Sequence, residues 1–150
     1  KRVGVFLDQG ISEVKDIADF CGLDLLQFHG SESPEYCDGF SQIVWKAFSI
    51  INESSFENIA NYNVRGFLLD SFTKAQGGSG KKFNWDLLEG REIPGKFILA
   101  GGIHSGNVEE AILRISPDIL DVSSGVETDG KKDYYKIKEL IGKVRLCQSI

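Results

Sequence analysis

Short apolar runs alternate along the chain with segments in which apolar residues recur at helical spacing. Several runs are apolar on both faces, which is typical of parallel strands covered by helices and not of half-exposed hairpins. These runs therefore predict strands. They are Val3–Leu7, Leu25–Phe28, Ile43–Phe48, Phe67–Leu69, Phe97–Ala100 and Ile119–Val122.

The segments between these runs predict helices. In the last two, apolar residues recur at i, i+3, i+4 and i+7, the spacing of one helix face. These faces are Val108, Ala111, Ile112 and Ile115 in one segment, and Ile137, Leu140, Ile141 and Val144 in the other. The predicted helix starts are Ser33 before Pro34, a capping box from Ser54 to Glu57, and the caps Asn84, Ser105 and Asp133.

About six βα units in strict alternation predict an α/β fold with an all-parallel sheet. Two architectures fit this order, a doubly wound open sheet and part of an eight-stranded barrel. A Gly-x-Gly-x-x-Gly loop after the first strand would favour the open sheet, and the sequence has none there. Glycines cluster instead after the last two strands, where barrel enzymes commonly bind phosphate. We therefore expect residues 1–150 to form one catalytic domain, a partial TIM (β/α)8 barrel.

Two glycine-bearing strand ends predict a phosphate site. One is Ala100-Gly101-Gly102-Ile103, and the next is Asp121-Val122-Ser123-Ser124-Gly125-Val126. Glycine lets the backbone approach a ligand closely, exposed amides at such turns can hold an anion, and the two serines add hydroxyl donors. Either loop alone could be an ordinary tight turn. Two adjacent strand ends of this type favour phosphate binding.

Polar residues at other strand ends are candidates for the same site. Asp70 follows Phe67–Leu69, so its carboxyl group would face the barrel mouth, where a partly buried carboxyl group can serve as a general acid. The alternative for Asp70 is a helix cap or a loop-stabilising role. Gln27 and His29 end the second run and could line the pocket, although a lone histidine is more often structural. Lys46 could line it too, or pair with a neighbouring carboxylate.

Composition and charge exclude several classes of protein. A net charge of −5 argues against general nucleic-acid binding, although backbone amides can still bind a small phosphorylated ligand. No apolar run approaches the roughly 20 residues that span a bilayer. The three cysteines show no paired metal-ligand spacing, so we expect free thiols in a reducing cytosol and no metal site. Neither Cys21, Cys37 nor Cys147 is placed to act as a nucleophile or base.

A polar loop from Gln76 to Lys82 carries several glycines. Its flexibility suits a lid that closes over a substrate. The alternative is a plain surface loop.

Taken in order, these segments resemble the phosphoribosylanthranilate isomerases of tryptophan biosynthesis, over essentially the whole chain. The most specific match is the motif from Asp121 to Glu127, which Gly130-Lys131-Lys132-Asp133 follows. The other matching stretches are Val3–Phe6, Leu26–Gly30, Val44–Ala47, Leu68–Asp70, Gly77–Trp85, Leu99–Ile103 and Asn107-Val108.

The resemblance implies an aldose–ketose isomerase that catalyses an Amadori rearrangement without a metal or organic cofactor. Phosphoribosylanthranilate would be converted to an aminodeoxyribulose phosphate, with Asp70 as the general acid that protonates the ring oxygen and Asp121 orienting the sugar. The phosphate would lie at the loops that contain Gly101, Gly102, Ser123, Ser124 and Gly125. The implied setting is cytoplasmic, as a monomer or homodimer with a small phosphorylated substrate. Fusion to a neighbouring pathway enzyme stays open.

One departure from the family pattern is large. The family begins with a strand ending in a Lys-Ile-Cys-Gly type motif, whose cysteine is the general base, and nothing here matches it. The arginine that helps to bind the anthranilate carboxylate belongs to the same opening segment. We expect about two further βα units, roughly 60 residues on the barrel scale, to precede Lys1. The 150 residues alone are then expected to be inactive.

Two other functions remain open on the sequence alone. Another phosphate-binding barrel, such as an indole-glycerol-phosphate synthase or an epimerase, would share the late glycine loops. An enzyme of this kind poorly explains why the stretch Leu68–Asp70 is followed by the stretch Gly77–Trp85. A non-catalytic phosphate-binding or scaffold fragment would need no base, and a cysteine-bearing upstream strand would favour the enzyme over it.

Overall fold

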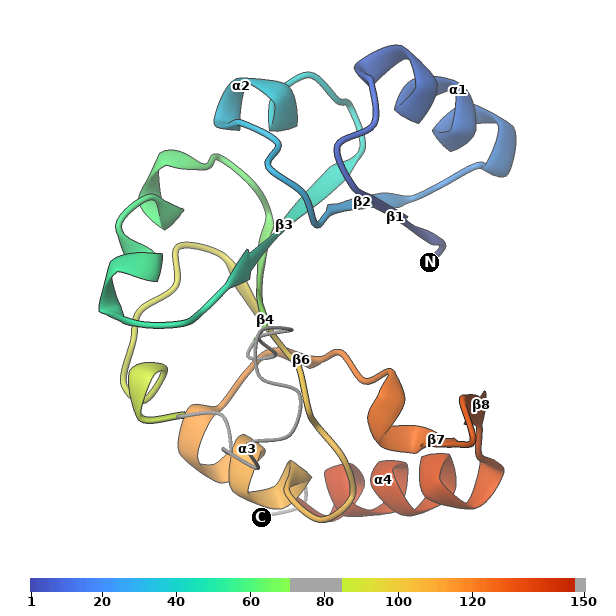
Figure 1. Ribbon diagram of the computed structural model, residues 1–150, viewed down its shortest axis with the longest axis vertical. Coiled ribbons are helices and arrows are strands. Elements are labelled where there is room, and N and C mark those ends of the chain that lie inside the picture. Colours follow the sequence, from blue (N-terminus) through green and yellow to red (C-terminus); the bar gives the residue numbers. More distant parts are fainter. Residues whose placement is uncertain (71–84, 148–150) are drawn as a thin grey trace.

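A curled parallel sheet forms the centre of the computed structural model, which describes residues 1–70 and 85–147. Six strands follow one another in sequence order across the sheet. Figure 1 shows the sheet curling into an open arc with helices around its outer side. The predicted α/β class is confirmed. The strands are β1 (Val3–Phe6), β2 (Leu25–Phe28), β3 (Ile43–Ser49), β4 (Gly66–Asp70), β5 (Lys96–Ala100) and β6 (Ile119–Leu120).

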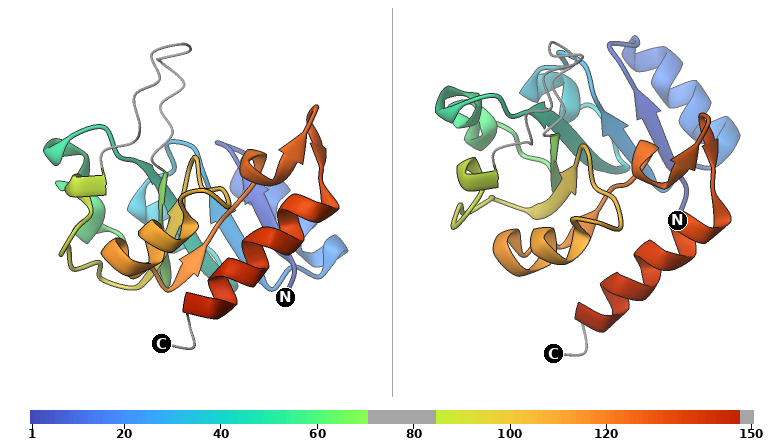
Figure 2. Two further views of the ribbon diagram at one scale, coloured as in Figure 1. Left: turned by 90° about the horizontal axis from the view of Figure 1, so that it is seen from below. Right: turned by 60° about the horizontal axis from the view of Figure 1, so that its bottom comes forward.

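Helices and short 3-10 turns connect the strands. The α-helices are α1 (Ile11–Cys21), α2 (Pro34–Cys37), α3 (Val108–Ile115) and α4 (Tyr134–Cys147). The 3-10 helices are η1 (Glu53–Phe56), η2 (Ile59–Asn61), η4 (Trp85–Leu87) and η5 (Ser124–Val126). An antiparallel hairpin, β7 (Glu127–Thr128) and β8 (Lys131–Lys132), follows β6 and leads into α4, as Figure 2 shows.

The main apolar core lies between the sheet and the helices. Successive strand residues point to opposite faces, so Phe67 and Leu69 enter this core while Leu68 faces the inner side of the arc. Leu68 packs there with Ile98 and Ala100 in a separate small cluster. Both faces of β4 are therefore buried, which explains why its sequence is an apolar run and not an alternation.

Each outermost strand has one unpaired edge in the described sheet. β1 pairs with β2 alone, and β6 pairs with β5 alone. On β1 the side chains of Val3 and Val5 are 43% and 62% exposed, and Leu7 just beyond it is 62% exposed. Such an edge offers backbone hydrogen bonds and apolar area to further strands.

The segment after β3 differs from its prediction. The capping box from Ser54 to Glu57 is wrong, because η1 begins after Asn52, whose backbone N–H donates to Ser55 Oγ at 3.3 Å. The strict alternation of strand and α-helix also fails here, since η1 and η2 take the helix's place. Asparagine and serine side chains compete for backbone hydrogen bonds, which disfavours a regular α-helix in this stretch.

The start of α3 also differs from its prediction. Ser105 is not the cap, because α3 begins at Val108 after Asn107. The Asn107 side chain accepts from His104 N at 2.8 Å and donates to Gly102 O at 2.9 Å. Residues 104–107 are thereby held in a turn, and Asn107 anchors the glycine loop to the helix.

The other predicted helix starts have different outcomes. Ser33 and Asp133 cap α2 and α4 as predicted, through hydrogen bonds accepted from Tyr36 N at 3.2 Å and Tyr135 N at 2.9 Å. Asn84 and the loop from 76 to 82 lie outside the described residues. β6 is shorter than the predicted Ile119–Val122. Within the described residues no helix is both long and apolar enough to cross a bilayer.

Candidate functional site

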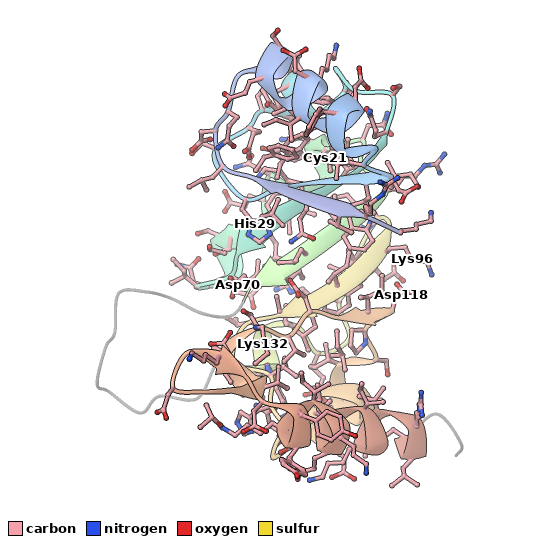
Figure 3. All side chains as sticks on the ribbon, turned by 90° about the vertical axis from the view of Figure 1, so that its right-hand side faces the viewer. Cys21, His29, Asp70, Lys96, Asp118 and Lys132 are labelled. Atoms are coloured by element: carbon pink, nitrogen blue, oxygen red, sulfur yellow. The ribbon has the colours of Figure 1, made fainter. Side chains whose placement is uncertain are left out.

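Four polar side chains gather at the carboxyl ends of the strands. Gln27 lies on β2 and His29 just beyond it, Asp70 ends β4, and Asp121 follows β6. Figure 3 shows His29 and Asp70 at the same end of the sheet, with Lys96 at the opposite end. The structure thus brings these predicted site residues to one edge.

The strand register places two of these residues on the inner face of the arc. Gln27 pairs with Trp45, and Asp70 pairs with Ala100. Both partners belong to the inner cluster around Leu68. Because paired residues in a parallel sheet point to the same side, Gln27 and Asp70 face the inside of the arc.

Gln27 and His29 are in direct contact. Gln27 is only 6% exposed, and its amide nitrogen lies 2.5 Å from His29 Nε2. An amide N–H donates only to an imidazole nitrogen that carries no proton, so this hydrogen bond belongs to the neutral form of His29. Burial lowers the pKa of His29 from its ordinary 6.5, although the charges of Asp121 and Asp70 act in the opposite direction. His29 is therefore a hydrogen-bonding group near neutral pH and not a cation.

Two glycine loops touch beyond β5 and β6. Gly101 and Gly102 have φ values of 82° and 65°, which favour glycine. A Cβ on Gly102 would meet nothing within 4 Å, so the space in front of this backbone is open. A Cβ on Gly125 would collide with the carbonyl oxygen of Ile103 and lie 2.8 Å from its carbonyl carbon. Only glycine at position 125 lets the two loops approach this closely.

Lys132 holds Ser123, and sequence reasoning did not single it out. Its Nζ donates to Ser123 O at 3.0 Å and to Ser123 Oγ at 3.2 Å, and it pairs with Glu127 Oε1 at 2.6 Å. Ser123 and Ser124 are both exposed. The lysine therefore fixes a hydroxyl group and adds a positive charge beside the second glycine loop.

The hairpin that carries Lys132 was not predicted, although the sequence holds a signal for it. It turns at Asp129 and Gly130, whose φ values are 51° and 73°. Two consecutive residues with positive φ form a type I′ turn, and Asp-Gly is a favoured dipeptide for this turn. The flanking strands have only two residues each, too few to show an alternating pattern.

Lys46 lies on the other side of the sheet from Gln27. It pairs in register with Phe28 and Phe67, both members of the outer core, and is 3% exposed. Its Nζ lies 3.3 Å from Glu32 Oε2. Pairing with a neighbouring carboxylate, the alternative that the sequence left open, is the correct interpretation.

The cysteines lie away from this edge. Cys21 and Cys147 end α1 and α4, and Cys37 is buried in α2. Burial raises the pKa of Cys37 to about 11. A thiol with this pKa stays protonated near neutral pH and is a poor proton acceptor. Within residues 1–70 and 85–147, no group of three or more His, Cys, Asp or Glu side chains could hold a metal ion.

Known proteins similar to the chain share one description. The family model described as N-(5'phosphoribosyl)anthranilate (PRA) isomerase matches residues 1–143. A relative from Thermoanaerobacter sp. (strain X514), named N-(5'-phosphoribosyl)anthranilate isomerase, is 46% identical over 147 residues, which cover 97% of this chain and 72% of the relative.

Solved structures agree with this match. The phosphoribosyl anthranilate isomerase of Thermotoga maritima is 38% identical with a TM-score of 0.84, over 96% of this chain and 72% of that one. A phosphoribosyl anthranilate isomerase in complex with reduced 1-(o-carboxyphenylamino)-1-deoxyribulose 5-phosphate is 32% identical with a TM-score of 0.78, over 96% and 71%.

Proposed function

The chain belongs to the N-(5'-phosphoribosyl)anthranilate isomerase family, and on that premise we propose that it carries the acid and phosphate-binding parts of the isomerase site. The reaction is the Amadori rearrangement of tryptophan biosynthesis, from N-(5'-phosphoribosyl)anthranilate to 1-(2-carboxyphenylamino)-1-deoxyribulose 5-phosphate. One observation carries the proposal. Asp70, the Gln27–His29 pair and both glycine loops occupy the carboxyl edge of the sheet, where barrel enzymes do their chemistry.

In the first step, Asp70 is the general acid. It gives its proton to the ribose ring oxygen as the bond from that oxygen to C1 breaks, and the anthranilate nitrogen supplies the electron pair for a C1=N iminium ion. A base then removes the C2 proton, which gives an enol with a C1=C2 double bond. The enol becomes the ketone as C1 takes up a proton and the C2 hydroxyl group loses one. Asp121, which follows β6, orients the sugar hydroxyl groups during these steps.

The glycine loops hold the substrate phosphate. Backbone N–H groups around Gly101, Gly102 and Gly125 can approach phosphate oxygens without hindrance from a side chain. Hydroxyl groups of Ser123 and Ser124 add donors. The charge of Lys132 favours an anion at the same place.

Gln27 and the neutral His29 contact the ligand from β2. An imidazole and an amide provide directed hydrogen bonds without adding charge, which suits the polar middle part of the substrate. Gln27 shares the inner face of the arc with Asp70, two strands away in the sheet.

We propose that turnover requires the open arc to be covered by further barrel strands. The edge of β1 presents Val3 and Val5 at 43% and 62% exposure, and an edge strand of this kind accepts a partner. The protonated thiol of Cys37 is unsuited to remove the C2 proton. The base would therefore come with the covering strands, and residues 1–150 would form one part of a barrel domain.

The experiment compares two proteins. One is the 150-residue chain, and the other carries before Lys1 a βαβα segment whose first strand ends in the family's Lys-Ile-Cys-Gly type motif. We expect substrate conversion by the chimera alone, and its loss when the cysteine of the added segment is replaced by serine. Full turnover by the 150-residue chain would contradict the need for closure. A folded chimera that binds the reduced product analogue without converting substrate would contradict the proposal that the covering strands bring the base.

One similar solved structure is described as a monomeric form of a dimeric isomerase from Thermotoga maritima. We propose that this protein works as a monomer or homodimer in the cytoplasm. Sedimentation of the chimera tests its oligomeric state.

A further inference from the structure

Two charged side chains are buried on the helix-facing side of the sheet, behind His29. The Lys46 and Glu32 side chains are 3% and 1% exposed, with Nζ and Oε2 3.3 Å apart. Taking two charges out of water offsets most of their attraction, so a buried pair is weak evidence for stabilisation. Its place next to the candidate site points to another role.

The Lys46 ammonium group binds the backbone on both sides of His29. It donates to the carbonyl oxygens of Gly30 at 2.8 Å and Phe28 at 3.4 Å, and to that of Ala47 at 3.0 Å. Phe28 and Gly30 precede and follow His29 in the chain. One buried group therefore holds the carbonyl groups of the residues before and after His29, in the Phe28–His29 and Gly30–Ser31 peptides.

Glu32 connects the pair to neighbouring strand ends. Its Oε1 accepts from Asp8 N at 2.9 Å, and its carbonyl oxygen accepts from Tyr62 OH at 3.0 Å. Asp8 in turn accepts from Ser31 N at 2.5 Å. The segments after β1, β2 and η2 are thus joined around one residue, Glu32. Lys46 is its counter-charge, so loss of the lysine would leave a buried, unpaired charge.

We propose that Lys46 and Glu32 form a positioning pair that fixes the backbone around His29 and so sets how Gln27 and His29 meet the ligand. The inference rests on the proposed function in one respect, that His29 belongs to the substrate site. The pair acts through His29, since Lys46 lies on the opposite side of the sheet from Gln27.

The two charges of the pair act on His29 with opposite signs. The charges that act on the imidazole are those of Asp121 beyond β6, Asp70 on β4, Lys46 on β3 and Glu32 after β2. Lys46 lowers the pKa of His29 and Glu32 raises it. Removing the charge of Lys46 should therefore raise the pKa of His29, and removing the charge of Glu32 should lower it. A general loosening of the fold would instead expose the ring and raise this pKa in both variants.

The first measurement is an NMR pH titration of the imidazole protons. The chain has only two histidines, so His29 and His104 can be followed separately. We expect the His29 pKa to rise in Lys46→Met, to fall in Glu32→Gln, and to return toward the wild-type value in the double variant. The second imidazole signal comes from His104, which lies before α3.

The second measurement titrates reduced 1-(o-carboxyphenylamino)-1-deoxyribulose 5-phosphate into each protein. Lys46→Met should weaken binding by about tenfold to hundredfold, since misplacing a positioned group by about an ångström has effects of this size. Binding of inorganic phosphate should stay unchanged, because the phosphate loops follow β5 and β6. An unchanged analogue affinity would overturn the positioning role.

The remaining outcomes separate the two hypotheses. Shifts of the same sign in both single variants, or no shift in either, would overturn the positioning pair. If Lys46→Met fails to fold, Glu32→Gln and the double variant decide by the same criterion. If the shifts are opposite but the analogue leaves the wild-type His29 signal unmoved, the role of His29 in the site is wrong. The electrostatic coupling to the pair would then stand without a role in ligand binding.

Discussion

Replacing Gly125 by alanine would test whether the two glycine loops form one phosphate cradle. The new Cβ would collide with the carbonyl oxygen of Ile103, and would lie 2.8 Å from its carbon and 3.1 Å from His104 Cβ. The carbonyl atoms belong to the backbone and cannot rotate away. The clash can be relieved only if the two loops move apart.

The size of the effect follows from these distances. Non-bonded carbon atoms pack at about 3.5–4.0 Å, so the loops must separate by roughly an ångström. Forcing extra atoms into a packed region costs about 1–3 kcal/mol, and we expect the free energy of unfolding to fall by this amount in Gly125→Ala. Donors displaced by roughly an ångström should lower phosphate affinity by about tenfold to hundredfold.

The matched control is Gly142→Ala on α4. A Cβ at position 142 meets nothing within 4 Å, and alanine in a helix interior is about 0.5–1 kcal/mol better than glycine. In urea unfolding, Gly142→Ala should be more stable than the wild type and Gly125→Ala less stable. In titrations with inorganic phosphate, only Gly125→Ala should bind more weakly than the wild type. Wild-type stability and affinity in Gly125→Ala would refute the close contact between the loops.

Three further predictions concern the same edge of the sheet. In the active chimera, Asp70→Asn should lower kcat by about 10²–10⁴ and leave KM nearly unchanged, as expected for a lost general acid; near-normal kcat would exclude the role. Lys132→Gln should weaken phosphate binding severalfold and make this binding less dependent on salt. The control Lys131→Gln should leave phosphate binding unchanged, because the Lys131 side chain points to the other face of the hairpin. Because folding lowers the pKa of His29, its contribution to stability is fully present above the ordinary value of 6.5. That contribution should be lost as the pH falls through the folded value. A His29→Gln variant should show a smaller loss of stability in urea unfolding over this range, and an identical pH dependence would contradict the assignment.

The order of the strands could be predicted because each is an apolar run between polar segments. β4, for example, is buried on both faces, so its sequence alone separates it from its surroundings. The connection after β3 could not be predicted in the same way. Its asparagines and serines satisfy several local hydrogen-bonding patterns, and the choice of Asn52 over Ser54 as the start of η1 depends on side-chain geometry.

Candidate site residues could be named from the sequence where a residue type has a direct chemical meaning. Strand-end glycines and Asp70 belong to this class. The role of Glu32 could not be predicted, because a glutamate beside Ser33 has no distinguishing pattern, and its partner Lys46 is distant in sequence. Their pairing depends on the register of β2 against β3, which becomes known only when the sheet is assembled.

The two ends of the sheet use ion pairs differently, and the difference favours the carboxyl end as the candidate site without any sequence motif. At the amino ends, Lys96 Nζ and Asp118 Oδ1 lie 2.6 Å apart with side chains 63% and 38% exposed, and the pair lowers the pKa of Asp118 (Figure 3). An exposed pair of this kind contributes about 0–1 kcal/mol, so it can be lost at little cost. At the carboxyl ends, breaking the buried Lys46–Glu32 pair would leave a charge away from water, which costs about 3–5 kcal/mol. An apolar pair of similar volume would stabilise the fold as well. A charged pair at this depth is therefore explained by what it orients, and Lys46 holds the carbonyl groups of Phe28 and Gly30, the residues on either side of His29.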